Sequence, residues 1–261
     1  MPSETIHKRF SAAAATYDHH ATVQRRVADS LMRLLPPDAQ PAHILEAGCG
    51  TGLLTEQLLD RFPQSRITAL DLSSSMIDVS REKLGRRDRV TWYASGLSEF
   101  QTGSQFPLFV SNAALHWVEP QRAAFEEIRR LLDDEGLLVC SIMIDGTLRE
   151  LRESRLHVAP HRPPLGRLPL GKEILEYVEA AGLSIERWHE DTIAERYAST
   201  RILLRSIHDM GLTGGAVSRA STPLQRGELR ELAEHYDATY AAPGGGIAAT
   251  YKVMYVKARA S

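Results

Sequence analysis

The predicted fold follows from one stretch of the chain, Ile44-Leu45-Glu46-Ala47-Gly48-Cys49-Gly50-Thr51-Gly52. The apolar run 42–45 predicts a buried strand, which is followed by an acidic residue. Glycines then occupy three alternate positions, where the backbone can take a positive φ or let a ligand approach closely. Leucines at helical spacing over 53–59 predict a helix whose unpaired N–H groups face the same turn. The stretch therefore predicts a strand, a glycine bend and a helix that hold a nucleotide-like ligand.

A second carboxylate follows at the spacing that such a ligand needs. Residues 66–71 predict a strand that ends at Asp71, which lies 19 positions after Gly52. A carboxylate about 20 residues after a glycine turn, at the end of the next strand, can accept hydrogen bonds from both ribose hydroxyls. The alternative is that Asp71 caps the helix predicted over 74–84, a role that Ser73 could share.

The glycine spacing separates two classes of ligand. The dinucleotide fingerprint G-x-G-x-x-G would place its third glycine at the position of Leu53. The spacing found, E-x-G-x-G-x-G, resembles motif I of class I S-adenosylmethionine-dependent methyltransferases. This resemblance implies S-adenosylmethionine as the cofactor, with contacts from Glu46, Gly48, Gly50, Gly52, Asp71, Leu72 and Met76. The alternatives are a glycine turn without a ligand and a plain core position for Met76.

The first 37 residues predict a helical arm outside the sheet. Ile6, Phe10, Ala14 and Tyr17 form one helical stripe, and a second helix is predicted over 20–35. A stripe of this kind usually packs against the rest of the fold. In the methyltransferases that the chain resembles, the arm instead closes over the cofactor. The resemblance implies cofactor contacts from His7, Phe10 and Tyr17.

Strands and helices alternate along the rest of the chain. Further strands are predicted over 90–94, 106–112, 137–142, 183–194 and 249–257. Helices are predicted over 121–132, 147–155, 173–181, 202–210 and 224–240. The alternation predicts a parallel sheet, and the period of two in 249–257 predicts a half-exposed or edge-proximal antiparallel strand. We therefore predict an α/β, Rossmann-like class I methyltransferase fold whose seven-stranded, mainly parallel sheet has an antiparallel last strand.

The chain is predicted to be a single domain, 1–261, with four parts. They are the arm, a cofactor-binding half, a cap with substrate-side insertions, and a final helix and strand, which span 1–37, 38–143, 144–222 and 223–261. Within the third part, 157–164 predicts a rigid basic loop and 211–215 a flexible insert.

The residues after strand 90–94 depart from the family pattern. Related enzymes often place an acidic residue there against the adenine, whereas this chain has Ser95 and Gly96. A backbone N–H or the Ser95 hydroxyl must then contact the adenine in place of the acidic residue. The resemblance implies cofactor contacts from Gly96 and Leu97. It also implies a cofactor contact from Ser111, near the end of strand 106–112.

Strand 106–112 ends at Asn112, beside which an open α/β sheet places its chemistry. Amino-methylating relatives carry Asn/Asp-Pro-Pro-Tyr/Phe at this point, but here Ala113-Ala114 follows, which argues against an adenine or glutamine target. His116 is a candidate general base because the pKa of histidine lies near neutral pH. The alternative is that His116 packs beside Trp117 at the edge of the cofactor.

The composition argues against several classes of function. A net charge of −2 creates no field that would favour nucleic acid or an anionic membrane. No apolar run approaches the ~18 residues of a membrane span, and no signal peptide is recognised. Cys49 and Cys140 are expected to be free thiols in a reducing compartment. We therefore expect a cytoplasmic monomer without a metal site.

Four segments resemble the malonyl-acyl-carrier-protein O-methyltransferases of biotin synthesis. They are 9–18, 146–151, 204–211 and 249–255, which read RFSAAAATYD, GTLREL, LRSIHDMG and ATYKVMY. The resemblance spans nearly the whole chain. It implies methyl transfer from S-adenosylmethionine to the free carboxylate of malonyl-acyl-carrier protein, or of malonyl-CoA. The resulting ester primes the formation of pimeloyl.

Carboxylate methylation requires alignment rather than a general base. The acceptor is an anion at neutral pH, and placing it in line can contribute roughly 7–11 kcal/mol. Because an arginine fork matches a carboxylate, Arg149 and Arg201 are candidate catalytic residues, with a surface salt bridge as the alternative for each. Further arginines are expected to face an acidic carrier protein and to raise the association rate, namely Arg152, Arg155, Arg162 and Arg205.

Three other functions remain compatible with the sequence. A methyltransferase for another small carboxylic acid, or for a phenol or quinone, would share the same core and would turn over such acceptors directly. A non-catalytic cofactor-binding module would bind the cofactor without turnover. A dehydrogenase is disfavoured by Leu53 and by the predicted antiparallel last strand.

Overall fold

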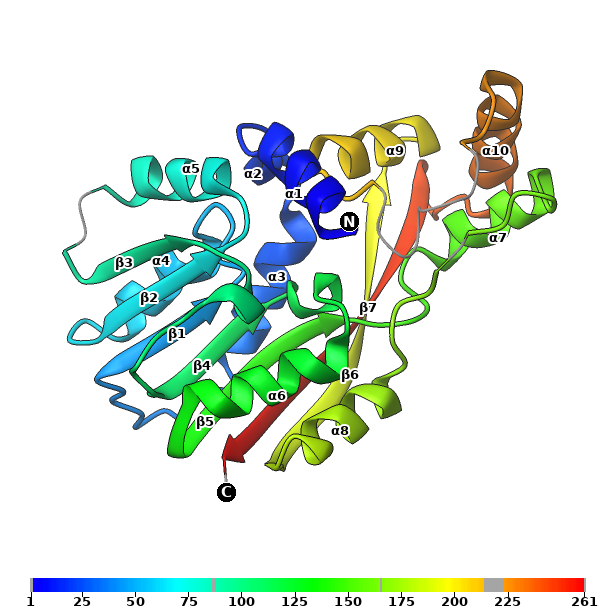
Figure 1. The fold of residues 1–261 in the computed structure, drawn as a ribbon. Coiled ribbons are helices and arrows are strands. Elements are labelled where there is room, and N and C mark those ends of the chain that lie inside the picture. Colours follow the sequence, from blue (N-terminus) through cyan, green and yellow to red (C-terminus); the bar gives the residue numbers. More distant parts are fainter. Residues whose placement is uncertain (1, 86–87, 165, 214–222, 261) are drawn as a thin grey trace.

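A seven-stranded sheet forms the centre of the molecule, in the order β3-β2-β1-β4-β5-β7-β6 (Figure 1). The computed structural model describes residues 2–85, 88–164, 166–213 and 223–260. The strands are β1 His43–Ala47, β2 Arg66–Asp71, β3 Val90–Ala94, β4 Phe106–Asn112, β5 Leu132–Met143, β6 Leu183–Tyr197 and β7 Ile247–Ala260. The pairs that involve β7 are antiparallel, and the other neighbouring pairs are parallel. The predicted fold class is therefore confirmed.

Helices cover both faces of this sheet. The α-helices are α1 Pro2–Ala13, α2 Tyr17–His20, α3 Thr22–Met32, α4 Leu53–Arg61, α5 Ser74–Leu84, α6 Gln121–Leu131, α7 Arg149–Val158, α8 Gly171–Ala180, α9 Thr200–Asp209 and α10 Arg226–Thr239. Short 3-10 helices are η1 Leu97–Glu99 and η2 Leu115–Trp117. Figure 1 shows α6 and α8 on one face, with α3 and α4 behind the other, and α7 and α10 in a lobe beside the N-terminal end of β7.

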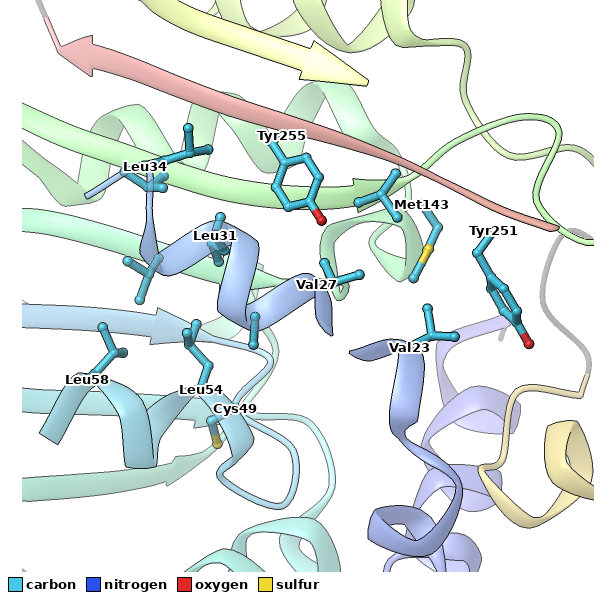
Figure 2. Packing of buried hydrophobic residues seen from close by; sticks show 14 of the residues in the cluster. Val23, Val27, Leu31, Leu34, Cys49, Leu54, Leu58, Met143, Tyr251 and Tyr255 are labelled. Carbon is cyan, nitrogen blue, oxygen red and sulfur yellow. The ribbon is translucent and has the colours of Figure 1, made fainter. Parts of the chain in front are cut away.

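Two apolar cores lie on opposite faces because neighbouring strand residues point in opposite directions. Ile44 joins a core with α3 and α4, whereas Leu45 joins one with α6 and α8. Figure 2 shows the first core, in which α3 lies between Leu54 of α4 and Tyr255 of β7. Burial on both faces explains why β1 reads as an uninterrupted apolar run.

β7 lies inside the sheet, and β6 forms the edge beside it. β6 pairs with β7 from Leu183 to Tyr197, so it covers the outer side of β7. Most side chains of β7 are buried, and the predicted half-exposed character of 249–257 is therefore wrong. Its antiparallel direction and its place next to the edge are confirmed. Lys252 and Lys257 fit a buried strand because their long stems carry Nζ out to carboxylates of β6, at 3.7 and 2.9 Å.

Several boundaries differ from the predictions. The helix predicted over 147–155 continues to Val158, so the first residues of the predicted basic loop are helical. The helix predicted over 20–35 is shorter, because Tyr17–His20 forms a separate turn and α3 ends at Met32. The insert predicted at 211–215 begins with a turn at Gly211, whereas Gly214 and Gly215 lie outside the described residues. Local propensity does not determine where tertiary contacts end an element.

Cys49 and Cys140 are buried free thiols, as predicted. None of the helices in the described part of the chain has the length and apolarity needed to cross a bilayer. The described residues contain no cluster of three or more His, Cys, Asp or Glu side chains placed to hold a metal ion.

Candidate active site

A cavity of about 380 Å³ lies at the carboxyl ends of β1, β2 and β4. The arm, the glycine bend, the start of α5, both 3-10 helices and segments after β5 contribute to its lining. The order of the sheet reverses between β1 and β4, because the chain runs outward through β2 and β3 and then returns to the other side of β1. Open α/β sheets bind their ligands at such a reversal.

The three glycines of the bend serve different purposes. All three have positive φ, at 73°, 54° and 81° for Gly48, Gly50 and Gly52. A Cβ on Gly48 would lie 2.2 Å from the Cβ of Ala114, and one on Gly52 would lie 2.2 Å from the Oγ of Ser80. A Cβ on Gly50 would meet no atom within 4 Å. Gly48 and Gly52 therefore permit packing of the protein on itself, whereas Gly50 leaves space for a ligand.

Asp71 holds the bend against the next helix. Its Oδ2 accepts the N–H of Gly50 at 2.8 Å, and its Oδ1 accepts the N–H of Ser73 at 2.8 Å. Burial raises the pKa of Asp71, and these two hydrogen bonds oppose the rise. The capping alternative therefore holds in part, since Ser73 in turn caps α5 by accepting the N–H of Met76 at 3.2 Å. Each carboxylate oxygen can accept another hydrogen bond, so Asp71 retains acceptors for the hydroxyl groups of a ribose. The ribose contact itself stays a prediction.

Glu46, Gly52 and Ser111 are absent from the lining among the described residues. Glu46 is buried, and its Oε2 accepts the hydroxyl of Thr55 of α4 at 2.7 Å. Burial, with a contribution from the charge of Asp71, raises the pKa of Glu46 to about 7. The hydroxyl of Ser111 donates to the carbonyl of Ala47 at 2.8 Å. These groups support the bend from behind, and their direct contact with a cofactor stays a prediction.

The arm lies over the cavity, and all three of its candidate residues line it: His7, Phe10 and Tyr17. The Oγ atoms of Ser11 and Ser73 lie 2.8 Å apart, and Thr51 donates to the Oδ1 of Asp18 at 2.5 Å. Burial raises the pKa of Tyr17, and the carboxylates of Asp71 and Asp18 raise it further. The phenol of Tyr17 therefore keeps its proton and can donate a hydrogen bond to a ligand.

The residues that the resemblance implies for adenine contacts also line the cavity: Leu72, Met76, Gly96 and Leu97. The hydroxyl of Ser95 donates to the carbonyl of Gly96 at 3.0 Å. Glu99, which the sequence analysis missed, also lines the cavity. Glu99 of η1 therefore brings a carboxylate to the lining, a few positions after the place where the family pattern has one.

His116 is half-buried in the lining next to Trp117, with the ring centroids 5.2 Å apart. Its Nδ1 has no hydrogen-bond partner in the described structure. Burial lowers the pKa of His116 to about 3, so the imidazole is neutral and weakly basic at neutral pH. This favours the packed alternative over the general base.

Comparisons with known proteins agree with this geometry. A family model described as a methyltransferase domain matches residues 44–136. The malonyl-acyl-carrier-protein O-methyltransferase of Geobacter sulfurreducens is 34% identical, and the alignment covers 96% of each chain. A second one, from Ilyobacter polytropus, is 30% identical over 98% of this chain and 97% of its own. The chain belongs to the malonyl-acyl-carrier-protein O-methyltransferase family.

Solved structures show the same fold at lower identity. An N-methyltransferase from Bradyrhizobium japonicum, in complex with S-adenosyl-L-homocysteine, aligns with a TM-score of 0.52 at 15% identity, over 90% of this chain and 86% of its own. A geranyl diphosphate C-methyltransferase from Streptomyces coelicolor aligns with a TM-score of 0.53 at 16% identity, over 90% and 78%. At these identities the likeness supports the fold alone.

In this methyltransferase the part of the cavity formed by Ile6 of the arm and by segments after β5 is largely apolar; it is called the apolar end below. It is lined by Ile6, Met143, Leu148, Leu151, Leu168, Ile207, Leu212 and Tyr251. Among the described residues, no lysine or arginine lines the cavity.

Neither candidate catalytic arginine reaches the cavity lining in the described structure. The side chain of Arg149 is 64% exposed, and its Nε lies 3.5 Å from the Oε1 of Glu150. Arg201 is exposed in the first turn of α9. These positions favour the alternative of surface residues, and a catalytic role for either stays a prediction.

The four arginines expected to face a carrier protein fall into two groups. Three donate within the protein: Arg152 to the carbonyl of Gly166 at 3.2 Å, Arg155 to that of Arg162 at 2.9 Å, and Arg162 to Glu228 at 3.0 Å. Arg205 is exposed on α9. The internal bonds give the first three a structural role besides any role in docking.

Two non-glycine residues of the lining have left-handed backbone conformations, Ala113 with φ 48° and Leu148 with φ 53°. Strain of this kind costs on the order of 1–3 kcal/mol per residue and is concentrated at functional sites.

The sequence analysis also missed Gln24 in the lining. A signal was present, because Gln24 falls in the buried stripe that continues with Ala28, Leu31 and Leu35.

Proposed function

We propose that the protein transfers the methyl group of S-adenosylmethionine to the free carboxylate of malonyl-acyl-carrier protein, or of malonyl-CoA, as a step of biotin synthesis. The observation that carries the proposal is a single cavity that joins the glycine bend to a largely apolar end. Similarity to malonyl-acyl-carrier-protein O-methyltransferases over nearly the whole chain supports the choice of substrate. A cytoplasmic location is part of the proposal.

The residues present fit S-adenosylmethionine. The open side of Gly50 leaves room for a ligand against the backbone, and Asp71 retains acceptor capacity for hydroxyl groups. The neutral phenol of Tyr17 can donate to a carboxylate end. Leu72, Met76 and Leu97 provide apolar surface for a flat ring system, with Glu99 near them as an acceptor for an amino group.

The apolar end suits a reaction in which charge disappears. When bound, S-adenosylmethionine supplies a methyl group on a positively charged sulfur. An approaching carboxylate carries the opposite charge. Both charges diminish as the methyl carbon gains a bond to oxygen and loses its bond to sulfur, which leaves as the neutral thioether S-adenosylhomocysteine. Leu148, Leu151 and Leu168 exclude water from this end, and surroundings of low polarity favour the loss of charge. No residue has to move a proton, because the acceptor is ionised at neutral pH.

An assay with labelled S-adenosylmethionine and purified malonyl-acyl-carrier protein tests the proposal. We expect a labelled methyl ester that releases methanol on mild alkaline hydrolysis, with turnover on the carrier protein or on malonyl-CoA. Turnover of free malonate or a phenol, but not of either malonyl thioester, would favour the alternative substrates. Cofactor binding without turnover of any acceptor would favour a non-catalytic module.

A companion measurement concerns the approach of the carrier protein. Arg201 and Arg205 are exposed on α9, the helix that also places Ile207 in the cavity lining. If they attract an acidic carrier protein, added salt will raise the KM for the carrier-bound substrate. The double substitution of Arg201 and Arg205 by Ala should reduce this salt dependence. A salt dependence equal to that of the wild type would rule out docking on α9.

A further inference from the structure

Gln24 of α3 is a buried polar residue of the cavity lining whose side-chain oxygen has no hydrogen-bond partner among the described residues. The residue is 7% exposed, and its Oε1 is buried. An unpaired buried amide atom costs about 1–3 kcal/mol. A half-turn about the last side-chain torsion exchanges the amide O and N positions, so the same group can direct N–H donors to a ligand.

Asn112 holds Gln24 at the carboxyl end of β4. The Nδ2 of Asn112 donates to the carbonyl of Gln24 at 3.1 Å, while its Oδ1 accepts the hydroxyl of Ser141 at 2.9 Å. Both ends of the Asn112 amide are therefore engaged in the scaffold. The group that this strand end offers to an acceptor substrate is then the amide of Gln24 rather than that of Asn112.

Gln24 stands at the border between the two ends of the cavity. Its neighbour Val23 packs in one core with Met143 and Tyr251 (Figure 2), and those two residues line the apolar end. On the other side, Asn112 ends the strand that pairs with β1, next to the glycine bend. An acceptor oxygen in line with a transferable methyl group has to lie at such a border.

A neutral donor suits this reaction better than a cation. The acceptor carboxylate has its full charge before the reaction and loses it as the bond to carbon forms. An arginine would therefore bind the ground state more tightly than the transition state, which slows the chemical step. A carboxamide orients the oxygen through a weaker bond, whose loss during the reaction costs less.

We propose that the side-chain amide of Gln24 donates a hydrogen bond to the substrate carboxylate and sets the reacting oxygen in line with the methyl group. This assignment rests on the proposed function and gives Gln24 the task that the sequence analysis assigns to Arg149 and Arg201. Gln24 thus recognises the free acid and discriminates against its methyl ester, which lacks the charge.

The test compares Gln24→Met, Gln24→Glu and a matched control, Gln64→Met, whose side chain is exposed in the turn before β2. We expect kcat/KM for the malonyl thioester to fall about ten- to hundredfold in Gln24→Met. Gln24→Glu should lose more, because two carboxylates then face each other. Affinity for S-adenosylhomocysteine, measured by calorimetry, should stay within threefold of the wild type in all three variants.

A second readout separates recognition from folding. With S-adenosylhomocysteine bound, Gln24→Met should bind the malonyl thioester at least tenfold more weakly than the wild type, but its methyl ester equally well. A merely structural role would weaken both. Wild-type-like kcat/KM in Gln24→Met and Gln24→Glu, or equal losses for acid and ester, would overturn the assignment. So would a tenfold loss of cofactor affinity with acceptor binding unchanged.

These outcomes are distinct from failure of the proposed function. If the wild type itself formed no ester from either malonyl thioester, the proposed function would fall and this assignment with it. If the wild type formed ester and the Gln24 variants matched it, only the assignment would fall. Arg149→Ala, assayed in parallel, tests the role that the sequence analysis assigns to that arginine, whose side chain is 64% exposed.

Discussion

The two ends of the cavity are built in different ways. The glycine end comes mainly from short neighbouring segments, and its shape depends on backbone conformation and on one carboxylate, Asp71. The apolar end is assembled from side chains as far apart in the sequence as Ile6, Leu168 and Ile207. The first end is encoded in local patterns, whereas the second exists only in the folded chain. From this comparison we expect that cofactor binding and acceptor choice can be altered separately.

The largest expected effect is at the glycine end, in Asp71→Ala. This substitution leaves the N–H groups of Gly50 and Ser73 unpaired and removes acceptors from the cavity. Hydrogen bonds to charged groups are each worth about 1.5–3 kcal/mol, so affinity for S-adenosylhomocysteine should fall roughly 10²–10⁴-fold by calorimetry. Asp78→Ala is the control, since its side chain is 72% exposed on α5. A loss below tenfold would mean that the bend keeps its shape without the carboxylate.

The next effect concerns the carboxyl behind the bend, in Glu46→Gln. Burial raises the pKa of Glu46 from 4.5 to about 7, so between these values the folded protein holds a proton that the unfolded chain releases. The stability contribution is complete below pH 4.5 and is lost as pH rises through about 7. As the pH rises from below 4.5 to above about 7, the unfolding free energy of the wild type should fall by about 3 kcal/mol relative to that of Glu46→Gln, which keeps an acceptor for Thr55.

Urea titrations of the ligand-free proteins at pH 5 and pH 7.5 measure this difference. A difference between wild type and Glu46→Gln that stays constant across the two pH values would contradict the raised pKa. It would also mean that the space behind the bend is more hydrated than its burial indicates.

A smaller effect separates ligand space from backbone strain, in Gly50→Ala. The new methyl group would meet no protein atom within 4 Å, so the fold loses only about 1–2 kcal/mol from the left-handed backbone. Because Gly50 lines the cavity, we expect the methyl group to take space from the ligand, and cofactor affinity should fall at least tenfold. Gly182→Ala is the control, with φ 78° and open space at the end of α8. It should show a similar loss of stability in urea titrations and unchanged affinity.

The smallest effect is at the apolar end, in Leu151→Ala. Removing part of a half-buried side chain should raise the KM for the malonyl thioester about three- to tenfold, through lost apolar contact. Affinity for S-adenosylhomocysteine should not change. Leu229→Ala, on α10 and 42% exposed, should change neither quantity. Equal losses of acceptor and cofactor binding in Leu151→Ala would mean that the two ends do not act separately.

The same division explains which predictions from the sequence succeeded. Helix α5 spans Ser74–Leu84 as predicted, because Ser73 caps it and its apolar spacing is clear. The alternation in β7 was read as half-exposure, because the chain pattern alone does not reveal that β6 covers the strand. Likewise, helical spacing showed that Arg149 and Arg152 share a face of α7. It did not show which way that face turns, because the orientation of α7 depends on a tertiary contact. The buried Glu150 fixes α7 by accepting the N–H of Thr250 at 3.1 Å.

The sequence by itself determined the class of fold, the glycine bend and the position of Asp71, because these depend on backbone geometry over short spans. It also indicated the family, through segments along most of the chain. Only the tertiary structure decided that Glu46 lies behind the bend and that the candidate arginines lie outside the cavity lining. The placement of Gln24 beside β4 was decided there too, because burial and partner choice depend on contacts between distant segments.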